Sequence, residues 1–120
     1  MTVEEFRKMA LQIPGALEAS HMRHPDFRIA GKIFATLGYP NKDWAMVKLT
    51  PEQQRKFIEK APTVFRACNG AWGRDGATNV DLAQAKLSIV RAALEAAAKN
   101  VVLKKQKRTP NVQPSAPNAQ

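Results

Sequence analysis

Apolar and polar residues alternate along the chain on both sides of one glycine, Gly31, between His24 and Leu37. The alternating positions are Phe27 and Ile29 against Asp26, Arg28 and Ala30, and then Ile33, Ala35 and Leu37 against Lys32, Phe34 and Thr36. Successive side chains of a strand point to opposite faces, so a period of two is typical of strands with two distinct faces. Because glycine permits the positive φ of a tight turn, the segment predicts two antiparallel strands joined at Gly31.

Three further segments alternate in the same way and extend the predicted sheet. They are residues 17–24, residues 44–49 and a short stretch that contains Thr78, Val80 and Leu82. Turn-forming residues separate the first two from their neighbours, Pro14 and Gly15 on one side and the run 39–43 on the other. We expect an antiparallel sheet of about five strands.

Two predicted helices begin at capping boxes, in which a threonine is followed three residues later by Glu or Gln. Thr2 with Glu5 predicts a helix over residues 3–12, and Thr50 with Gln53 predicts one from residue 51 to about 60. A third helix is expected over residues 83–101, whose composition favours helix and whose apolar stripe comprises Leu87, Val90, Leu94, Ala97 and Val101. We expect this last helix to pack behind the sheet.

The predicted elements define an α+β fold in one domain, residues 1–103, in which helices back the sheet. Val64 and Phe65 form an apolar pair before a glycine-rich segment, residues 69–76, which we expect to be a sharply bent loop. Residues 104–120 combine a basic cluster with three prolines among polar residues, and this composition predicts a disordered tail.

The chain carries a formal net charge of +9, from 19 Lys and Arg against 10 Asp and Glu. Lys104, Lys105, Lys107 and Arg108 contribute +4 without any acid in residues 104–120, which leaves the domain at +5. A positive surface attracts polyanions such as nucleic acid, and it also keeps a small protein in solution. Both interpretations stay open at this point.

One cysteine and a polar, acidic amino-terminal segment bear on the compartment. Cys68 has no partner in the chain for an intramolecular disulfide, and residues 1–5 lack the basic and then apolar pattern of a signal peptide. No apolar run reaches the length of about 20 residues that spans a bilayer. We expect a cytoplasmic protein that does not enter the membrane.

Candidate catalytic and metal-binding residues do not form a recognised set. His21 and His24 are three residues apart, which on a continuous strand places them on opposite faces, so we expect no metal site. Cys68 has no evident base near it in the sequence, and it is expected to be a small, partly buried residue. We therefore expect no catalytic residues and no cofactor. A cleft that brought His24, Cys68 and Trp72 together would favour an enzyme instead.

Cations and one tryptophan in the predicted turns are candidates for contact with nucleic acid. Arg28 and Lys32 flank Gly31, where both could meet phosphates at the tip of a hairpin. Trp72 and Arg74 lie in the glycine-rich segment, where an indole can stack on a base. The alternatives are that the hairpin cations only solvate and protect the sheet, and that Trp72 folds inward over its end.

Several separated motifs in order resemble the MmcQ/YjbR family of small bacterial proteins over roughly residues 3–103. They are His24-Pro25-Asp26-Phe27-Arg28, Gly31-Lys32-Ile33-Phe34-Ala35-Thr36, Lys48-Leu49-Thr50-Pro51-Glu52, Gly70-Ala71-Trp72-Gly73 and Thr78-Asn79-Val80. The resemblance implies a fold similar to CyaY and frataxin, and DNA binding through a double-wing arrangement. The acidic ridge with which frataxin-like proteins bind iron is not matched here, because the acids of residues 4–28 are interleaved with Arg and Lys.

The sequence and the resemblance together predict a non-catalytic, monomeric protein that binds double-stranded DNA. The expected contacts are Arg28, Lys32, Trp72, Arg74, Lys104, Lys105, Lys107 and Arg108. The basic cluster of the tail would follow phosphates without reading bases, since base readout needs contacts held in fixed geometry. The alternative is a module that binds a protein or a small ligand, in which the charge serves solubility.

Overall fold

The computed structural model describes residues 1–108, with side chains for residues 1–103. Its elements are α1 (Val3–Leu11), β1 (Ala16–His21), β2 (His24–Ile29), β3 (Lys32–Leu37), β4 (Trp44–Lys48), α2 (Pro51–Lys60), β5 (Phe65–Ala67), α3 (Gly70–Arg74), β6 (Ala77–Asp81), a 3-10 turn η1 (Leu82–Gln84) and α4 (Leu87–Arg108). The strands form one sheet in the order β1-β2-β3-β4-β6-β5, and all neighbours are antiparallel. The predicted α+β class, a sheet backed by helices, is confirmed.

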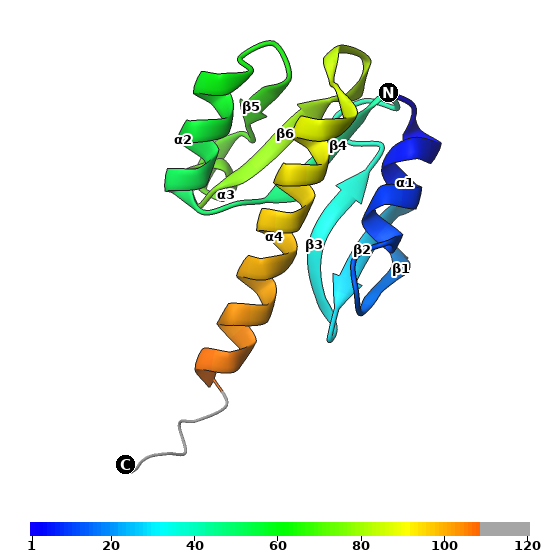
Figure 1. The fold of residues 1–120 in the computed structure, drawn as a ribbon, viewed down its shortest axis with the longest axis vertical. Helices are drawn as coiled ribbons and strands as arrows, with labels where there is room; N and C mark the ends of the chain where they lie inside the picture. Colours follow the sequence, from blue (N-terminus) through cyan, green and yellow to red (C-terminus); the bar gives the residue numbers. More distant parts are fainter. Residues whose placement is uncertain (109–120) are drawn as a thin grey trace.

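Helices lie against one face of the curved sheet. In Figure 1, α4 runs along β3 and β4, α1 lies beside β1 and β2, and α2 lies by β5 and β6. The core fills the space between them, and its largest fully buried side chains include Phe6 of α1, Phe27 of β2 and Leu94 of α4. The helices α1, α2 and α4 therefore cover one face, while the other face carries a smaller buried cluster of Met46, Cys68 and Ala77.

The helix starts follow the predicted capping boxes. Thr2 accepts from the backbone N–H of Glu5, and Glu5 accepts from the backbone N–H of Thr2. Thr50 and Gln53 make the same reciprocal pair at α2. α4 begins later than predicted, at Leu87, because residues 82–84 form η1 instead, where the Asp81 side chain accepts from Ala83 N–H.

The prediction of one strand over residues 17–24 is wrong at its C-terminal end. Residues 17–24 do not form one strand, because a two-residue turn at Met22 and Arg23 separates β1 from β2 and places His21 directly opposite His24. Both turn residues have positive φ, 49° and 69°. A turn of this kind is usually marked by Asn or Gly, and neither residue type occurs here, so the sequence gives no local signal for it.

The segment after α2 also differs from the expectation. The apolar pair of Val64 and Phe65 leads into a sixth strand, β5, which is only three residues long and pairs with β6. The predicted glycine-rich loop contains the short helix α3. Gly73 makes this compact arrangement possible, since a Cβ there would lie 1.6 Å from the carbonyl oxygen of Cys68.

The last helix, α4, extends past residue 103, the predicted end of the domain. α4 continues through the basic cluster to Arg108, and the remaining part of the predicted tail, residues 109–120, lies outside the described residues. Over the part of the chain that is described, none of the helices has both the length and the apolar character needed to cross a membrane.

Candidate functional site

The second face of the sheet, which we call the outer face, is turned away from α1 and α4. Phe27 packs edge-on against Phe6 of α1, with ring centroids 6.2 Å apart, so Phe27 marks the covered face. Its neighbour Asp26 must point the other way, as does Thr36, which is directly opposite Asp26 on β3. The outer face is therefore the side of Asp26 and Thr36.

Asp26 is fully buried although it points away from α1 and α4. Arg28, two residues along β2, donates from Nε to Oδ1 at 2.7 Å and from Nη2 to Oδ2 at 3.0 Å. His21 on β1 lies 2.7 Å from Oδ2 through its Nδ1. The hydrogen bonds from Arg28, opposed by burial and assisted by His21, lower the pKa of Asp26 below its ordinary value. The carboxylate of Asp26 is thus ionised, and the guanidinium of Arg28 balances its charge.

The pairing with Asp26 fixes the orientation of the His21 ring. A carboxylate accepts hydrogen bonds only, so Nδ1 of His21 carries the proton that is donated to Oδ2. In the neutral ring, Nε2 then has a free lone pair and is an acceptor. The side chain is 38% exposed on the outer face.

A pocket of about 370 Å³ lies beside His21 on the outer face. It is lined by His21, Met22, His24, Thr36, Tyr39 and Trp72. The His24 and Tyr39 rings meet edge to face at 6.0 Å, while Tyr39 and Trp72 are 52% and 45% exposed. The expectation that His21 and His24 lie on opposite faces is wrong, because the turn between them puts both on the outer face.

A second aromatic side chain with a cation lies further along the same face. The guanidinium carbon of Arg66 on β5 is 5.2 Å from the ring centroid of Trp44 on β4. Their register places both on the outer face, because Arg66 is opposite Asn79, and Asn79 is opposite Met46, two residues from Trp44. A cation above an indole is a favourable arrangement, so Arg66 is held on the surface rather than free to fold away.

Cys68 does not belong to the pocket. It is buried beside Met46 and Ala77, and its thiol donates to Oδ1 of Asn79 at 3.1 Å. Burial raises the pKa of the Cys68 thiol to about 11. His24 and Trp72 do meet in one pocket, but Cys68 is not among its lining residues, so the cleft that would favour an enzyme is not formed.

The predicted hairpin cations point to different sides of the sheet. Arg28 lies on the outer face with Asp26. Lys32 is directly opposite Ile29, which lines a pocket with side chains of α1 and α4, so Lys32 belongs to the covered side. Arg74 is exposed at the end of α3. The side chains of Lys104, Lys105, Lys107 and Arg108 lie outside the described residues.

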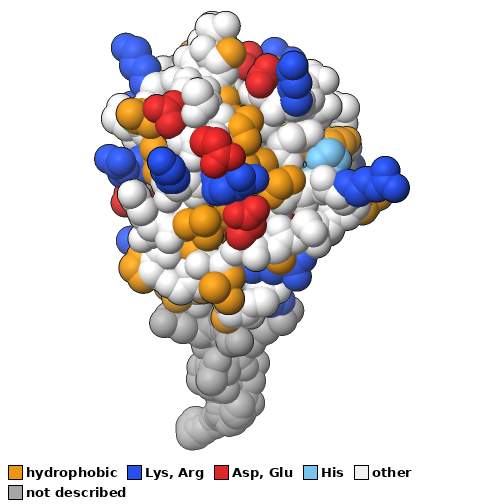
Figure 2. Space-filling view, turned by 90° about the vertical axis from the view of Figure 1, so that its right-hand side faces the viewer, with side chains coloured by type: hydrophobic (Ala, Val, Ile, Leu, Met, Phe, Trp, Pro, Cys, Tyr) orange, Lys and Arg blue, Asp and Glu red, His pale blue; other side chains and the backbone are white. Residues whose placement is uncertain are grey.

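The surface around α1 and β1 carries charges of both signs. Figure 2 shows Lys and Arg side chains next to Asp and Glu on this side of the molecule. Arg7, for example, lies 2.7 Å from Glu4 and 3.3 Å from Glu18. Within residues 1–103, no three His, Cys, Asp or Glu side chains are grouped so that they could hold a metal ion. The positive charge therefore does not form a uniform coat.

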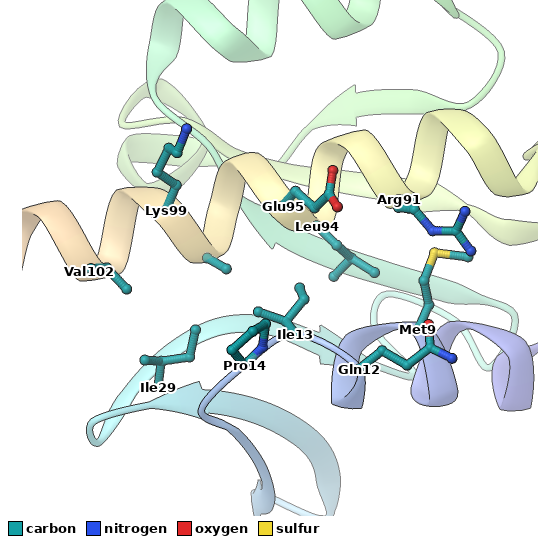
Figure 3. A pocket seen from close by; sticks show the side chains of 11 residues that line it. Met9, Gln12, Ile13, Pro14, Ile29, Arg91, Leu94, Glu95, Lys99 and Val102 are labelled. Carbon is teal, nitrogen blue, oxygen red and sulfur yellow. The ribbon is translucent and has the colours of Figure 1, made fainter.

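A further hollow of about 470 Å³ lies between α1 and α4. Figure 3 shows Ile13 and Ile29 facing Leu94 across it, while Glu95 and Lys99 turn their charged ends away. Among its lining residues, Met9 and Leu94 belong to the buried core, whereas Arg91, Glu95 and Lys99 are charged residues of α4. It provides apolar shape with few polar groups that could orient a ligand.

Trp72 and Arg28 are predicted as contacts from the sequence, whereas His21, Tyr39 and Asp26 are not predicted as parts of one site. Tyr39 and Trp72 are far apart in the chain, and no spacing relates them. Asp26 did carry a signal, because a charged residue in the middle of an alternating strand is costly to bury unless it is paired. The partners of such a charged residue are expected two positions along the same strand or on the adjacent strand.

These features define a class of protein: a small α+β domain with helices on one face of a six-stranded antiparallel sheet and an aromatic, cationic second face. The profile of the YjbR family matches residues 11–97, and the chain belongs to this family. The crystal structure of protein DR2400 of Deinococcus radiodurans, a DUF419 domain, is similar with a TM-score of 0.66 at 14% identity, over 80% of this chain and 75% of that one. No curated protein matches the chain.

Proposed function

We propose that the protein binds DNA through the outer face of its sheet, and that it prefers single strands. The observation that carries the proposal is the combination of half-exposed Tyr39 and Trp72 with the exposed guanidinium group of Arg66 on the outer face. Single-stranded nucleic acid is bound by this pairing of stacking surfaces with cations along the backbone.

The charge distribution supports a polyanionic partner on this face. The Asp26 carboxylate is compensated by Arg28, so it does not repel phosphates as an exposed acid would. The guanidinium carbon of Arg66 lies 5.2 Å from the ring centroid of Trp44, and Arg66 is exposed. The formal net charge of +9 adds a long-range attraction.

The aromatic side chains favour single strands over the duplex expected from the family resemblance. In a duplex the bases stack on one another, and their faces are not available to Tyr39 or Trp72. Arg28 and Lys32 point to opposite sides of the hairpin, so they do not act together as a wing tip on one groove. A single strand can follow the outer face and place its bases against the rings.

Fluorescence anisotropy with the full chain tests the proposal. Labelled single-stranded and duplex DNA of about 20 nucleotides are titrated from about 50 mM salt upward, and each phosphate contact to a single strand contributes about −0.7 to the log-log salt slope. We expect tighter binding of the single strand. Binding of the duplex alone, or a salt-independent signal, would contradict the proposal.

Matched charge variants localise the contact. Arg66→Gln is expected to weaken single-strand binding and to reduce the salt slope by about one contact. Arg91→Gln makes the same change in charge on α4, behind the sheet, and is expected to leave binding unchanged. A fourfold Gln variant of Lys104, Lys105, Lys107 and Arg108 measures the share of the basic cluster. If that variant alone abolishes binding, the outer face is not the binding surface.

A further inference from the structure

We infer that the pocket between Tyr39 and Trp72 holds one unstacked nucleobase, whose edge N–H donates a hydrogen bond to Nε2 of His21. This inference rests on the proposed function and names the part of the nucleic acid that is recognised. It assigns a role to the one pocket in the described structure that combines aromatic walls with an oriented imidazole.

The size and the walls of the pocket suit a single planar ring system. Its volume of about 370 Å³ lies near the small end of the range for ligand sites, which runs from about 300 to 1,000 Å³. Trp72, Tyr39 and His24 are three rings around one hollow. Tyr39 and Trp72 keep about half of their surface open, so they can cover a base that enters from solvent.

The imidazole of His21 is the polar group in the pocket whose donor and acceptor nitrogens are assigned by its contact with Asp26. Asp26 accepts the Nδ1 proton of His21, so in the neutral ring Nε2 presents a lone pair. Every nucleobase has an N–H group on its Watson–Crick edge, at a ring nitrogen or an exocyclic amine. Thr36, which also lines the pocket, has a hydroxyl that can donate to or accept from the same edge.

The buried ion pair explains why this imidazole keeps one orientation. Arg28 occupies Oδ1 and shares Oδ2 of Asp26, so the carboxylate is fixed and the ring that it holds is fixed with it. A preorganised acceptor costs no reordering when a ligand binds. The arrangement of three side chains from two strands therefore serves recognition as well as stability.

Titration with free nucleosides measures binding in the pocket separately from binding to the rest of the outer face. Adenosine and cytidine carry no phosphate, so their binding reports the pocket without the electrostatic contribution of the backbone. Two-dimensional NMR with the full chain follows the indole N–H of Trp72 and the ring signals of His21. We expect both to shift on titration with either nucleoside, with little dependence on salt.

Variants test the two parts of the pocket. His21→Phe keeps an aromatic ring but removes the acceptor, and we expect nucleoside binding to weaken about fivefold, the effect of one hydrogen bond. Trp72→Ala removes a stacking surface, and we expect a loss of at least about fivefold. Trp44→Phe changes a tryptophan of the same face outside the pocket, and it should leave nucleoside binding unchanged.

The outcomes distinguish this inference from the proposed function. Single-strand binding together with nucleoside shifts that His21→Phe weakens supports both. Single-strand binding without nucleoside shifts at Trp72 and His21 overturns the pocket assignment and leaves the function intact. Nucleoside binding without single-strand binding supports a base-sized pocket and overturns the proposed function. The absence of both overturns both.

Discussion

The carboxylate of Asp26 has no exposed surface and is held by Arg28, its neighbour two residues along β2, through hydrogen bonds of 2.7 and 3.0 Å. Residues i and i+2 of a strand share a face, so both partners of this ion pair lie on one strand and on the same side of the sheet. His21 completes the arrangement from β1. The contact of His21 with the buried carboxylate therefore depends on the register in which β1 pairs with β2.

The folded protein is expected to lose stability in acid through Asp26. Its pKa in the folded state lies below the ordinary value of 3.8, so the folded protein binds fewer protons than the unfolded chain. The stabilising contribution is complete well above pH 3.8 and is lost as the pH falls through that value towards the lower folded pKa. Urea unfolding from pH 6 down to about pH 2 measures this loss.

Asp26→Asn tests the assignment. The variant is expected to be less stable at neutral pH, because Arg28 and His21 lose a charged partner, and its stability should fall less steeply with acid than that of the parent. Asp43→Asn removes an exposed carboxylate as the control. Equal acid slopes for the parent and Asp26→Asn would rule out this role for the buried pair.

Two glycines of α3 are expected to respond very differently to alanine. A Cβ at Gly73 would lie 1.6 Å from the carbonyl oxygen of Cys68, so α3 must move away from Cys68. We expect Gly73→Ala to cost more than about 3 kcal/mol. Gly70 has φ of +72° but open space around it, so Gly70→Ala should cost only about 1 kcal/mol of backbone strain. Denaturant unfolding compares the two, and similar losses would contradict the close contact at Gly73.

The helices α1, α2 and α4 and the strand alternation could be predicted because their signals are local. The capping boxes at Thr2 and Thr50 each lie within four residues, and the hairpin at Gly31 is marked by its glycine. The turn at Met22 and Arg23 is different, since the tertiary pairing of β1 with β2 holds two residues with side chains at positive φ. Without that turn, the sequence places His21 and His24 on opposite faces of one strand, so their shared pocket is not predicted.

The rest of the site depends on contacts between distant parts of the chain. Tyr39 follows β3, and Trp72 lies on a helix whose position is set by the close approach of Gly73 to Cys68. No periodicity relates these residues, because the sheet order brings β6 between β4 and β5. The pocket is therefore visible only after the strands are paired, whereas its single members can be found from their residue types.

The side-chain amide of Gln54 is expected to be the main polar link between α2 and the region around α3. Its Nε2 lies within 3.0 to 3.1 Å of three buried acceptors, the carbonyl oxygens of Gly73 and Ala77 and the hydroxyl of Thr78. Gln54→Leu removes this shared donor, while the carbonyl oxygens of Gly73 and Ala77 keep the backbone N–H groups of Gly76 and Cys68. We therefore expect a loss of about 1 kcal/mol. Gln84→Leu, an exposed position, should change stability by less than about 0.5 kcal/mol. Equal effects of the two substitutions in urea unfolding would contradict the link.

Cys68 is expected to be chemically inert in the folded protein. Burial raises its thiol pKa from 9.0 to about 11, and the thiolate is the reactive species, so at pH 8 the thiolate fraction is about a hundredfold lower than in the unfolded chain. The buried position beside Met46 and Ala77 slows access further. Iodoacetamide labelling followed by mass spectrometry should be slow in buffer and rapid in urea. Cys68→Ser is the unreactive control, and rapid labelling of the folded parent would show that the thiol reaches solvent and would reopen the case for cysteine chemistry.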